Sequence, residues 1–266
     1  MCSSDLIPAV QISMAIFLPL AAYEAITLWF PNLFTSGKLL RAQSQIDEII
    51  RVASPIENHS VRTPNSFELD IERATVAWDR EFMEPVTTTV CAGELLVIRG
   101  DSGSGKSTLA LALVGALGYK GSISIGGVEL RDMDGLHRYV SASLQSGHIF
   151  NTTLRENLKI ADSNCDDAKL LRIASLLELE AIDLDEVIGE FGRPVSGGEA
   201  KRIGVARALL SPAPIIILDE PTEHLDQERA HRLEQRIADE CADKALIVIT
   251  HSGWGKSTRT VLIKRE

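Results

Sequence analysis

The fold of this chain is decided by the stretch "LLVIRGDSGSGKSTLALALVGALG", residues 95–118. It begins with an apolar run typical of a buried strand, continues through a glycine-rich segment, and ends in leucines and alanines that favour a helix. Gly100, Gly105, Lys106 and Ser107 complete the phosphate-binding loop pattern G-x-x-x-x-G-K-[ST] between that strand and that helix. We therefore expect an α/β fold that binds a nucleotide. The alternative, a glycine-rich loop without function, would not require this strand and helix.

The composition of this loop has a physical reason. Glycines at 100, 103 and 105 allow backbone N–H groups to converge on phosphate oxygens, and the helix N-terminus adds a partial positive charge. Lys106 would reach the terminal phosphates, and the Ser107 hydroxyl would ligate Mg²⁺. The predicted nucleotide-binding residues of the loop are Gly100, Asp101, Ser102, Gly103, Ser104, Gly105, Lys106, Ser107 and Thr108.

The tetrad Gly-Lys-Ser-Thr occurs a second time in "SGWGKST", residues 252–258. The loop pattern requires a glycine at position 250, where this chain has Thr250. The residues that follow, 259–266, alternate like a strand and do not resemble a helix. We therefore expect a surface loop at the second tetrad and one nucleotide site in the chain.

Two adjacent carboxylates follow the apolar run in "PIIILDEP", residues 214–221. Such a run is typical of a buried parallel strand, which would deliver both acids to the sheet edge beside the phosphate-binding loop. We expect Asp219 to hold Mg²⁺, directly or through water, and Glu220 to polarise an attacking water. Paired acids after a strand also serve as helix caps, so this interpretation depends on the loop upstream.

The sequence "VSGGEAKRIGVARALL", residues 195–210, resembles the signature L-S-G-G-Q and its helix in the ATP-binding cassette (ABC) ATPases. The resemblance covers about residues 66–266. It implies an ABC-type P-loop NTPase domain with a helical signature subdomain, ATP as substrate, Mg²⁺ as cofactor and ATP hydrolysis as activity. It also implies that the signature acts on the nucleotide of a facing subunit, through Ser196, Gly197, Gly198 and Glu199.

Four further positions match motifs of the family. The resemblance implies that Gln145 contacts Mg²⁺ or water, that His251 acts in catalysis with Glu220, and that Trp78 stacks on adenine. It also assigns Asp226 to the D-loop. Three of these residues have an ordinary structural alternative: a solvated loop residue for Gln145, a strand-end cap for His251 and a core aromatic for Trp78.

A long apolar run, residues 6–30, precedes the cassette. As a helix it would extend roughly 37 Å, enough for a hydrocarbon core of about 30 Å. Lys38, Arg41 and Arg51 follow the run and no basic residue precedes it, which places the C-terminal side in the cytoplasm. We expect a span in lipid at the plasma or inner membrane, with the cassette on the cytoplasmic side. The run is too long for a signal peptide and lacks a basic start.

These segments predict three parts of the chain. Residues 1–35 would be the C-terminal transmembrane helix of an ABC transmembrane domain, 36–65 a cytosolic helix extension and linker, and 66–266 the ABC ATP-binding domain. The formal net charge of −10 argues against a nucleic-acid partner, because neutralising phosphates needs a concentrated basic face.

The phrase "HIFNTTLRENL", residues 148–158, is similar to exporter-type cassettes. More narrowly, "LPLAAYEA" at 18–25 and "DEPTEHLD" at 219–226 resemble the CydC-type subunits of CydDC exporters, which are linked to cytochrome bd assembly. That resemblance implies a second half-transporter as partner in a heterodimer and a thiol or haem-related cargo. Because such half-transporters have six spans before the cassette, it also implies that this chain is N-terminally truncated or that the remaining helices come from another polypeptide. Two alternatives stay open: a soluble ABC ATPase without a transport role, and a truncated, non-catalytic remnant that binds nucleotide.

Overall fold

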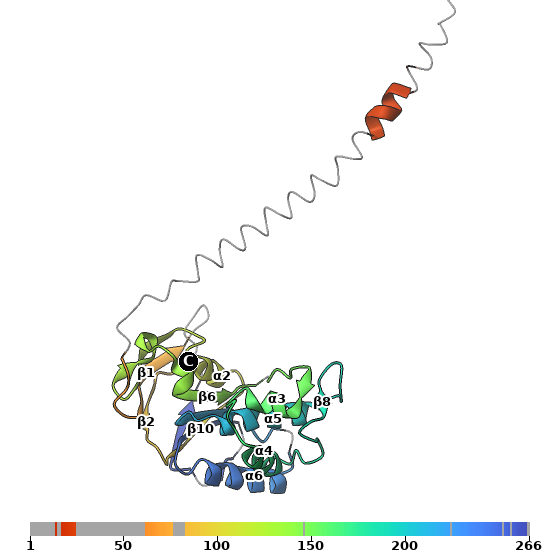
Figure 1. The fold of residues 1–266 in the computed structure, drawn as a ribbon. Coiled ribbons are helices and arrows are strands. Elements are labelled where there is room, and N and C mark those ends of the chain that lie inside the picture. The colour runs from red at the N-terminus through yellow and green to blue at the C-terminus, as the bar shows by residue number, and fades with distance from the viewer. Residues whose placement is uncertain are drawn as a thin grey trace, which may run out of the picture. The chain divides into compact units, whose positions relative to one another are not determined.

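The computed structural model describes residues 14, 17–24, 62–76, 83–145, 147–223, 225–251, 253–255 and 257–264. The chain divides into two compact units, Met1–His59 and Ser60–Glu266, and each is described by itself. In the first unit, the described residues form an exposed helical segment, red in Figure 1. No helix within the described residues is both long and apolar enough to cross a membrane. Most of the predicted span at 6–30 and of the extension and linker at 36–65 lies outside them.

The centre of the second unit is a five-stranded parallel sheet with the strand order β11-β3-β10-β9-β6. Its strands are β3 (Leu95–Gly100), β6 (Val140–Ser143), β9 (Ile215–Asp219), β10 (Ala245–Thr250) and β11 (Arg259–Ile263). Every residue of β9 and β10 is buried, which explains why both read as continuous apolar runs. The two predicted buried strands are thus confirmed as β3 and β9.

A second, antiparallel sheet has the strand order β2-β1-β4-β5. Its strands are β1 (Leu69–Val76), β2 (Val86–Val90), β4 (Tyr119–Ile125) and β5 (Val128–Glu129). The inward residues of β1 pack with those of the parallel sheet in one hydrophobic cluster that also contains the buried face of the helix after β3. The antiparallel sheet therefore covers the same face of the parallel sheet as this helix does. A short pair, β7 (Thr152–Thr153) and β8 (Val187–Ile188), stands apart from both sheets.

The helices of this unit, which Figure 1 labels, differ in how their first turns are capped. They are α2 (Lys106–Leu113), α3 (Leu154–Lys159), α4 (Asp167–Leu176), α5 (Gly197–Leu210) and α6 (Gln227–Glu240), with short 3₁₀ turns at Leu130–Asp132 and Leu136–Arg138. A polar side chain caps the first turn of α3, α4, α5 and α6, through Thr153, Asp166, Ser196 and Asp226. Helix α2 follows Gly105 and has no such side-chain cap within the described residues.

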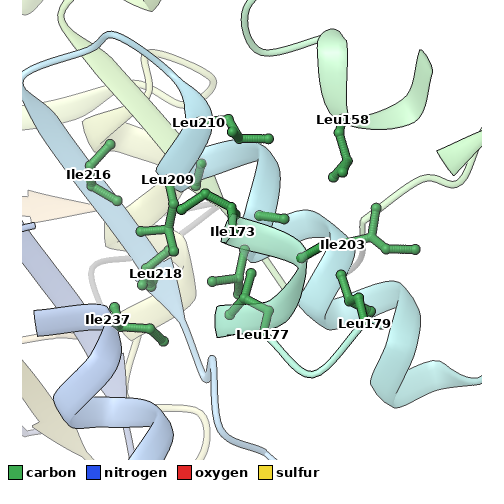
Figure 2. Packing of buried hydrophobic residues seen from close by; sticks show 14 of the residues in the cluster. Leu158, Ile173, Leu177, Leu179, Ile203, Leu209, Leu210, Ile216, Leu218 and Ile237 are labelled. Atoms are coloured by element: carbon green, nitrogen blue, oxygen red, sulfur yellow. The ribbon is translucent and has the colours of Figure 1, made fainter. Parts of the chain in front are cut away.

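Helix α5 packs against α3, α4 and β6, and a hydrophobic cluster fills the space between these helices and the parallel sheet. Figure 2 shows its members from α4, α5, α6 and β9 pointing toward one another, among them Ile173, Ile203, Leu218 and Ile237. Alternate residues of each central strand belong to the two clusters: Ile216 to this one and Ile217 to the other. Because both faces of the sheet are buried, polar groups emerge at its ends, where the site lies.

Candidate functional site

The glycine-rich loop runs from the carboxyl end of β3 to the start of α2, and its glycines are required by space and by backbone geometry. A Cβ atom on Gly100 would lie 2.4 Å from the Ile263 carbonyl oxygen and 2.6 Å from the Ser104 Oγ. Gly103 and Gly105 have φ angles of 79° and 97°, in the left-handed region where glycine has no steric penalty. The loop therefore holds a shape that other residues could not adopt without strain.

The N-terminus of α2 is open to an anion. Its first N–H groups have no capping side chain among the described residues, and its first turn carries no acidic residue. The Lys106 side chain is 8 % exposed, and its Nζ donates hydrogen bonds of 2.7 Å to the carbonyl oxygens of Gly100 and Asp101. A positive charge thus lies on the loop itself, where phosphate oxygens would meet both the ammonium and the helix N-terminus.

Asp219 ends β9 as a buried carboxylate, and neither of its oxygens accepts a hydrogen bond of normal geometry among the described residues. The residue is 1 % exposed. Burial raises the pKa of Asp219 above its ordinary value, although the Ser107 hydroxyl and the charges of Lys201 and Lys106 act in the opposite direction. An unpartnered buried carboxylate is costly for the fold unless a cation neutralises it. The donor set of Asp219 and the Ser107 hydroxyl therefore fits a hard divalent cation such as Mg²⁺.

Glu220, the next residue, is held in a strained and well-fixed position. Its φ angle is 49°, a conformation that costs a non-glycine residue about 1–3 kcal/mol. Its Oε1 accepts from the His251 backbone N–H at 2.8 Å and contacts the His251 Nδ1 at 2.7 Å. Its Oε2 accepts from the Thr250 hydroxyl at 3.1 Å. The end of β10 thus fixes the orientation of the Glu220 carboxylate.

The ring of His251 is orientated by the same contact. Because an ionised carboxylate only accepts hydrogen bonds, we assign the proton of the contact to Nδ1 of His251, which leaves Nε2 for another partner. The His251 side chain is 61 % exposed, whereas that of Glu220 is 15 % exposed. The histidine therefore combines a fixed ring with access from solvent.

A cleft of about 580 Å³ joins these groups, within the usual range of small-molecule sites. It is lined by Ser102, Gly103, Gly105, Lys106, Ser107, Thr108, Gln145, Glu220, Glu223 and His251. Of the predicted loop residues, Gly100, Asp101 and Ser104 do not line the cleft, and they shape the loop behind it. Gln145 comes from the segment after β6, so the cleft brings together residues from four strand ends.

Two predicted groups lie elsewhere in the structure. Ser196 caps α5 in a capping box: its Oγ accepts from the Glu199 N–H at 3.2 Å, and the Ser196 N–H donates to Glu199 Oε2 at 2.9 Å. The other Glu199 oxygen accepts from Arg193 at 3.0 Å. Asp226 caps α6 by accepting from the Arg229 N–H at 3.0 Å. The signature residues, 196–199, and Asp226 do not line the cleft. Trp78 lies outside the described residues.

Two residues that the sequence did not single out lie at this site. Glu223 lines the cleft. Lys201, on the first turns of α5, donates to the Leu144 carbonyl oxygen at 3.4 Å and is close to three carboxylates, those of Asp219, Glu223 and Glu220. Burial lowers the pKa of Lys201, and these carboxylates act against that shift. In the sequence, Lys201 looks like one of several basic residues on the solvated face of a helix, so only the packing reveals it.

The described residues of the second tetrad, Gly255, Ser257 and Thr258, lie in a loop, as predicted. The Gly255 N–H donates to Glu234 Oε2 at 3.0 Å. The Thr258 N–H donates to the Leu95 carbonyl oxygen at 3.0 Å, and the Leu95 N–H donates to the Thr258 hydroxyl oxygen at 3.2 Å. Strand β11 begins directly after Thr258, at Arg259, so the tetrad leads into a strand and not into a helix. Lys256 lies outside the described residues.

The fold and site define a P-loop ATPase cassette, and the chain matches the family described as ABC transporter over residues 83–223. It is 31% identical over 265 residues to the glutathione/L-cysteine transport system ATP-binding/permease protein CydC of Escherichia coli K12, covering 94% of this chain and 46% of that protein. It is 30% identical over 241 residues to an ATP-dependent lipid A-core flippase of Desulfotalea psychrophila, covering 85% and 42%. This chain belongs to the ABC transporter family.

A solved structure supports the fold. A bacterial Atm1-family ABC exporter with ATP bound superposes with a TM-score of 0.71 at 23% identity, over 84% of this chain and 42% of that one. The chain spans about half the length of the curated relatives it matches. The predicted ABC-type ATPase cassette is thereby confirmed, and ABC-type ATPase domains use Mg²⁺ together with ATP.

Proposed function

We propose that this chain is the ATP-binding and ATP-hydrolysing subunit of a membrane exporter, acting as one of two facing cassettes. The observation that carries the proposal is the cleft that brings the loop residues 102, 103 and 105–108 to Glu220 and His251. Lys106 and the open N-terminus of α2 bind the terminal phosphates of ATP. Trp78 is proposed to stack on the adenine ring.

The proposed ligands of Mg²⁺ are Ser107, Gln145 and Asp219. The buried, unpartnered carboxylate of Asp219 supports this assignment, as does the position of Ser107 and Gln145 in one cleft. Bound there, the ion would neutralise charge on the phosphate oxygens of ATP.

In the proposed reaction, Glu220 orients a water molecule in line with the γ-phosphate and accepts a proton from it. The water oxygen forms a bond to phosphorus while the bond to the bridging oxygen of ADP breaks. His251 holds the carboxylate through Nδ1 and is proposed to present Nε2 to the γ-phosphate. Because these groups are fixed before ATP binds, orientation and charge neutralisation supply most of the rate.

The site needs a second cassette. Ser196, Gly197, Gly198 and Glu199 lie outside the cleft of their own chain, so we propose that they complete the nucleotide site of the facing subunit. Asp226 would act at the same interface. The similarity to both the CydC and the CydD proteins of Escherichia coli K12 supports a half-transporter of the CydD type as the partner.

The membrane assignment is part of the proposal. Residues 1–35 would end a transmembrane domain, 36–65 would connect it, and 66–266 would form the cassette on the cytoplasmic side of the plasma or inner membrane. The similarity to a glutathione/L-cysteine transport protein supports a thiol cargo. A haem-related cargo and a connection with cytochrome bd assembly are proposed from the resemblance of the sequence to CydC-type subunits alone. Alkaline carbonate extraction tests it: we expect the full chain to stay with the membrane, and release into the supernatant would contradict the span.

The central test is the dependence of ATP turnover on a facing cassette. We expect the full-length chain to be nearly inactive as a monodisperse monomer and to gain activity with concentration or with its partner subunit. Calorimetric titration with MgATP in the same samples separates binding from turnover. Full activity in a verified monomer would overturn the shared-site arrangement.

A further inference from the structure

The loop that follows His251 is held by a buried carboxylate from another element. Glu234 lies in α6 and is 5 % exposed, and its Oε2 accepts the Gly255 N–H at 3.0 Å. Glycine 255 belongs to the second Gly-Lys-Ser-Thr tetrad, which binds no phosphate in the proposed mechanism. This tetrad is instead hydrogen-bonded to α6 through Gly255, which lies four residues after His251 in the chain.

Two further contacts hold the same loop. Arg99 Nη2 donates to the Trp254 carbonyl oxygen at 3.4 Å. The Trp254 ring is 5 % exposed and belongs to the hydrophobic cluster that also contains Leu233 and Ile237 of α6. The loop is therefore attached to α6 through both its backbone and its largest side chain.

Glu234 also faces the segment that follows Glu220. Burial raises the pKa of Glu234, while the Gly255 N–H, the charges of His231 and Arg99 and the Thr222 hydroxyl lower it in part. The His231 Nδ1 lies 3.9 Å from Glu234 Oε2. A carboxylate this buried is tolerated only with such partners. They come from both sides, Thr222 from the segment after Glu220 and Gly255 from the segment after His251.

A second cleft, of about 590 Å³, is lined both by Glu234 with its partners and by the proposed catalytic residues. Glu220 and His251 line it, and so do Thr222, Glu234, Trp254 and Gly255. We propose that Glu234 is a positioning residue for ATP hydrolysis: by fixing residues 253–255 onto α6, it sets where His251 meets Glu220. This inference rests on the proposed role of His251.

The test compares Glu234→Ala, Glu234→Gln and a matched control, Glu240→Ala. Glu240 lies on the same helix, its side chain is 15 % exposed, and it pairs with Arg172 of α4 instead of the loop. We expect Glu234→Ala to lower kcat about 10- to 100-fold, because a small displacement of a reacting group has an effect of this size. The KM for ATP should stay within about twofold, since the phosphate-binding loop is untouched.

Glu234→Gln should recover kcat to within about threefold of wild type, because the amide oxygen still accepts the Gly255 N–H. Glu240→Ala should lower the unfolding midpoint and leave kcat in place. A wild-type kcat in Glu234→Ala would overturn the proposal. So would equal losses of kcat and stability in Glu234→Ala and Glu240→Ala, because these indicate a merely structural role.

A readout without turnover keeps this test separate from that of the proposed function. The imidazole NMR signals of His251, assigned with His251→Asn, should shift in Glu234→Ala and stay unchanged in Glu240→Ala. This result is expected even if the wild-type protein shows no ATPase activity. Unmoved signals would overturn the inference. If Glu234→Ala does not fold, hydrogen exchange in the wild-type chain decides: the Gly255 amide should be protected, and free exchange would refute its bond to Glu234.

Discussion

The two Gly-Lys-Ser-Thr tetrads of this chain have identical residues and different structures. The first, at 105–108, follows the carboxyl end of β3 and begins α2. The second, at 255–258, ends beside the amino end of β3, where Thr258 bonds to Leu95, and leads into β11. In parallel sheets, ligands bind at the carboxyl edge. The position of the tetrad relative to the sheet therefore decides whether it binds phosphate.

The residue five positions before each tetrad gives the physical reason. Gly100 lies so close to the Ile263 carbonyl that no side chain fits. Its counterpart Thr250 is 1 % exposed at the end of β10, and its hydroxyl donates to Glu220. Gly100 thus allows the loop to lie against the Ile263 backbone, whereas Thr250 donates a hydrogen bond to the carboxylate of Glu220.

The largest expected effect contrasts the glutamates beside the two loops. Glu220→Gln should retain MgATP binding and lower turnover about 10²- to 10⁴-fold, because the amide cannot accept a proton from water. Glu234→Gln, beside the second tetrad, should lower it by no more than about threefold. Steady-state ATPase assays and calorimetry on the full chain with its partner subunit measure both. Normal hydrolysis by Glu220→Gln would remove Glu220 from its role.

The second largest effect contrasts the lysines of the two tetrads in their contribution to MgATP binding. Lys106→Ala removes charge-assisted hydrogen bonds to phosphate, each of which contributes about 1.5–3 kcal/mol, so the Kd for MgATP should rise about 10- to 150-fold. Lys256→Ala should leave the Kd within about twofold. Isothermal titration calorimetry gives both values. Equal losses in the two variants would mean that both tetrads bind nucleotide.

The glycines should differ in stability. Gly100→Ala forces the loop or β11 to shift and should lower the free energy of unfolding by about 1–3 kcal/mol. At Gly255 an added Cβ meets only ordinary contacts, the nearest at 3.5 Å to His231, so Gly255→Ala should change it by less than about 0.5 kcal/mol. Urea unfolding followed by circular dichroism measures the difference. A Gly100→Ala variant as stable as wild type would show that the crowding is relieved at little cost.

The smallest effect concerns the glycine-containing start of a third helix, α5. Its first N–H groups are capped by Ser196 within the chain. The Ser196 backbone and hydroxyl and the Arg193 charge hold the pKa of Glu199 below its ordinary value of 4.5. The charge therefore contributes stability above that value, and the contribution is lost as pH falls through the lower folded pKa. Glu199→Gln should be destabilised by about 0.5 kcal/mol at neutral pH and should equal wild type in strong acid. Unfolding free energies of both across this pH range test the sign.

The parts of the site that could be predicted from the sequence are those that a local residue pattern determines. An apolar run followed by glycines, or by two carboxylates, specifies a strand end within a few residues, and β3 and β9 confirm both. The absence of a helix after the second tetrad followed from the alternation in β11. The span at 6–30 and the adenine contact of Trp78 stay predictions.

The remaining features depend on residues far apart in the sequence. Glu234 lies in "QERAHRLEQRIADE", residues 227–240, where it looks like one more charge on a solvated helix face. It is buried because the loop after β10 packs over it. The positive φ of Glu220 and the place of Lys201 among three carboxylates likewise arise from the meeting of separate elements.

The contact between Gly100 and Ile263 has a consequence for synthesis on the ribosome. Strand β11 pairs with β3 in parallel and its last residue faces the first residue of the phosphate-binding loop. The loop is translated well before β11. A nascent chain thus emerges with its loop sequence complete but without the neighbour that shapes it, so we expect the growing polypeptide to bind ATP tightly only after β11 has left the exit tunnel and docked.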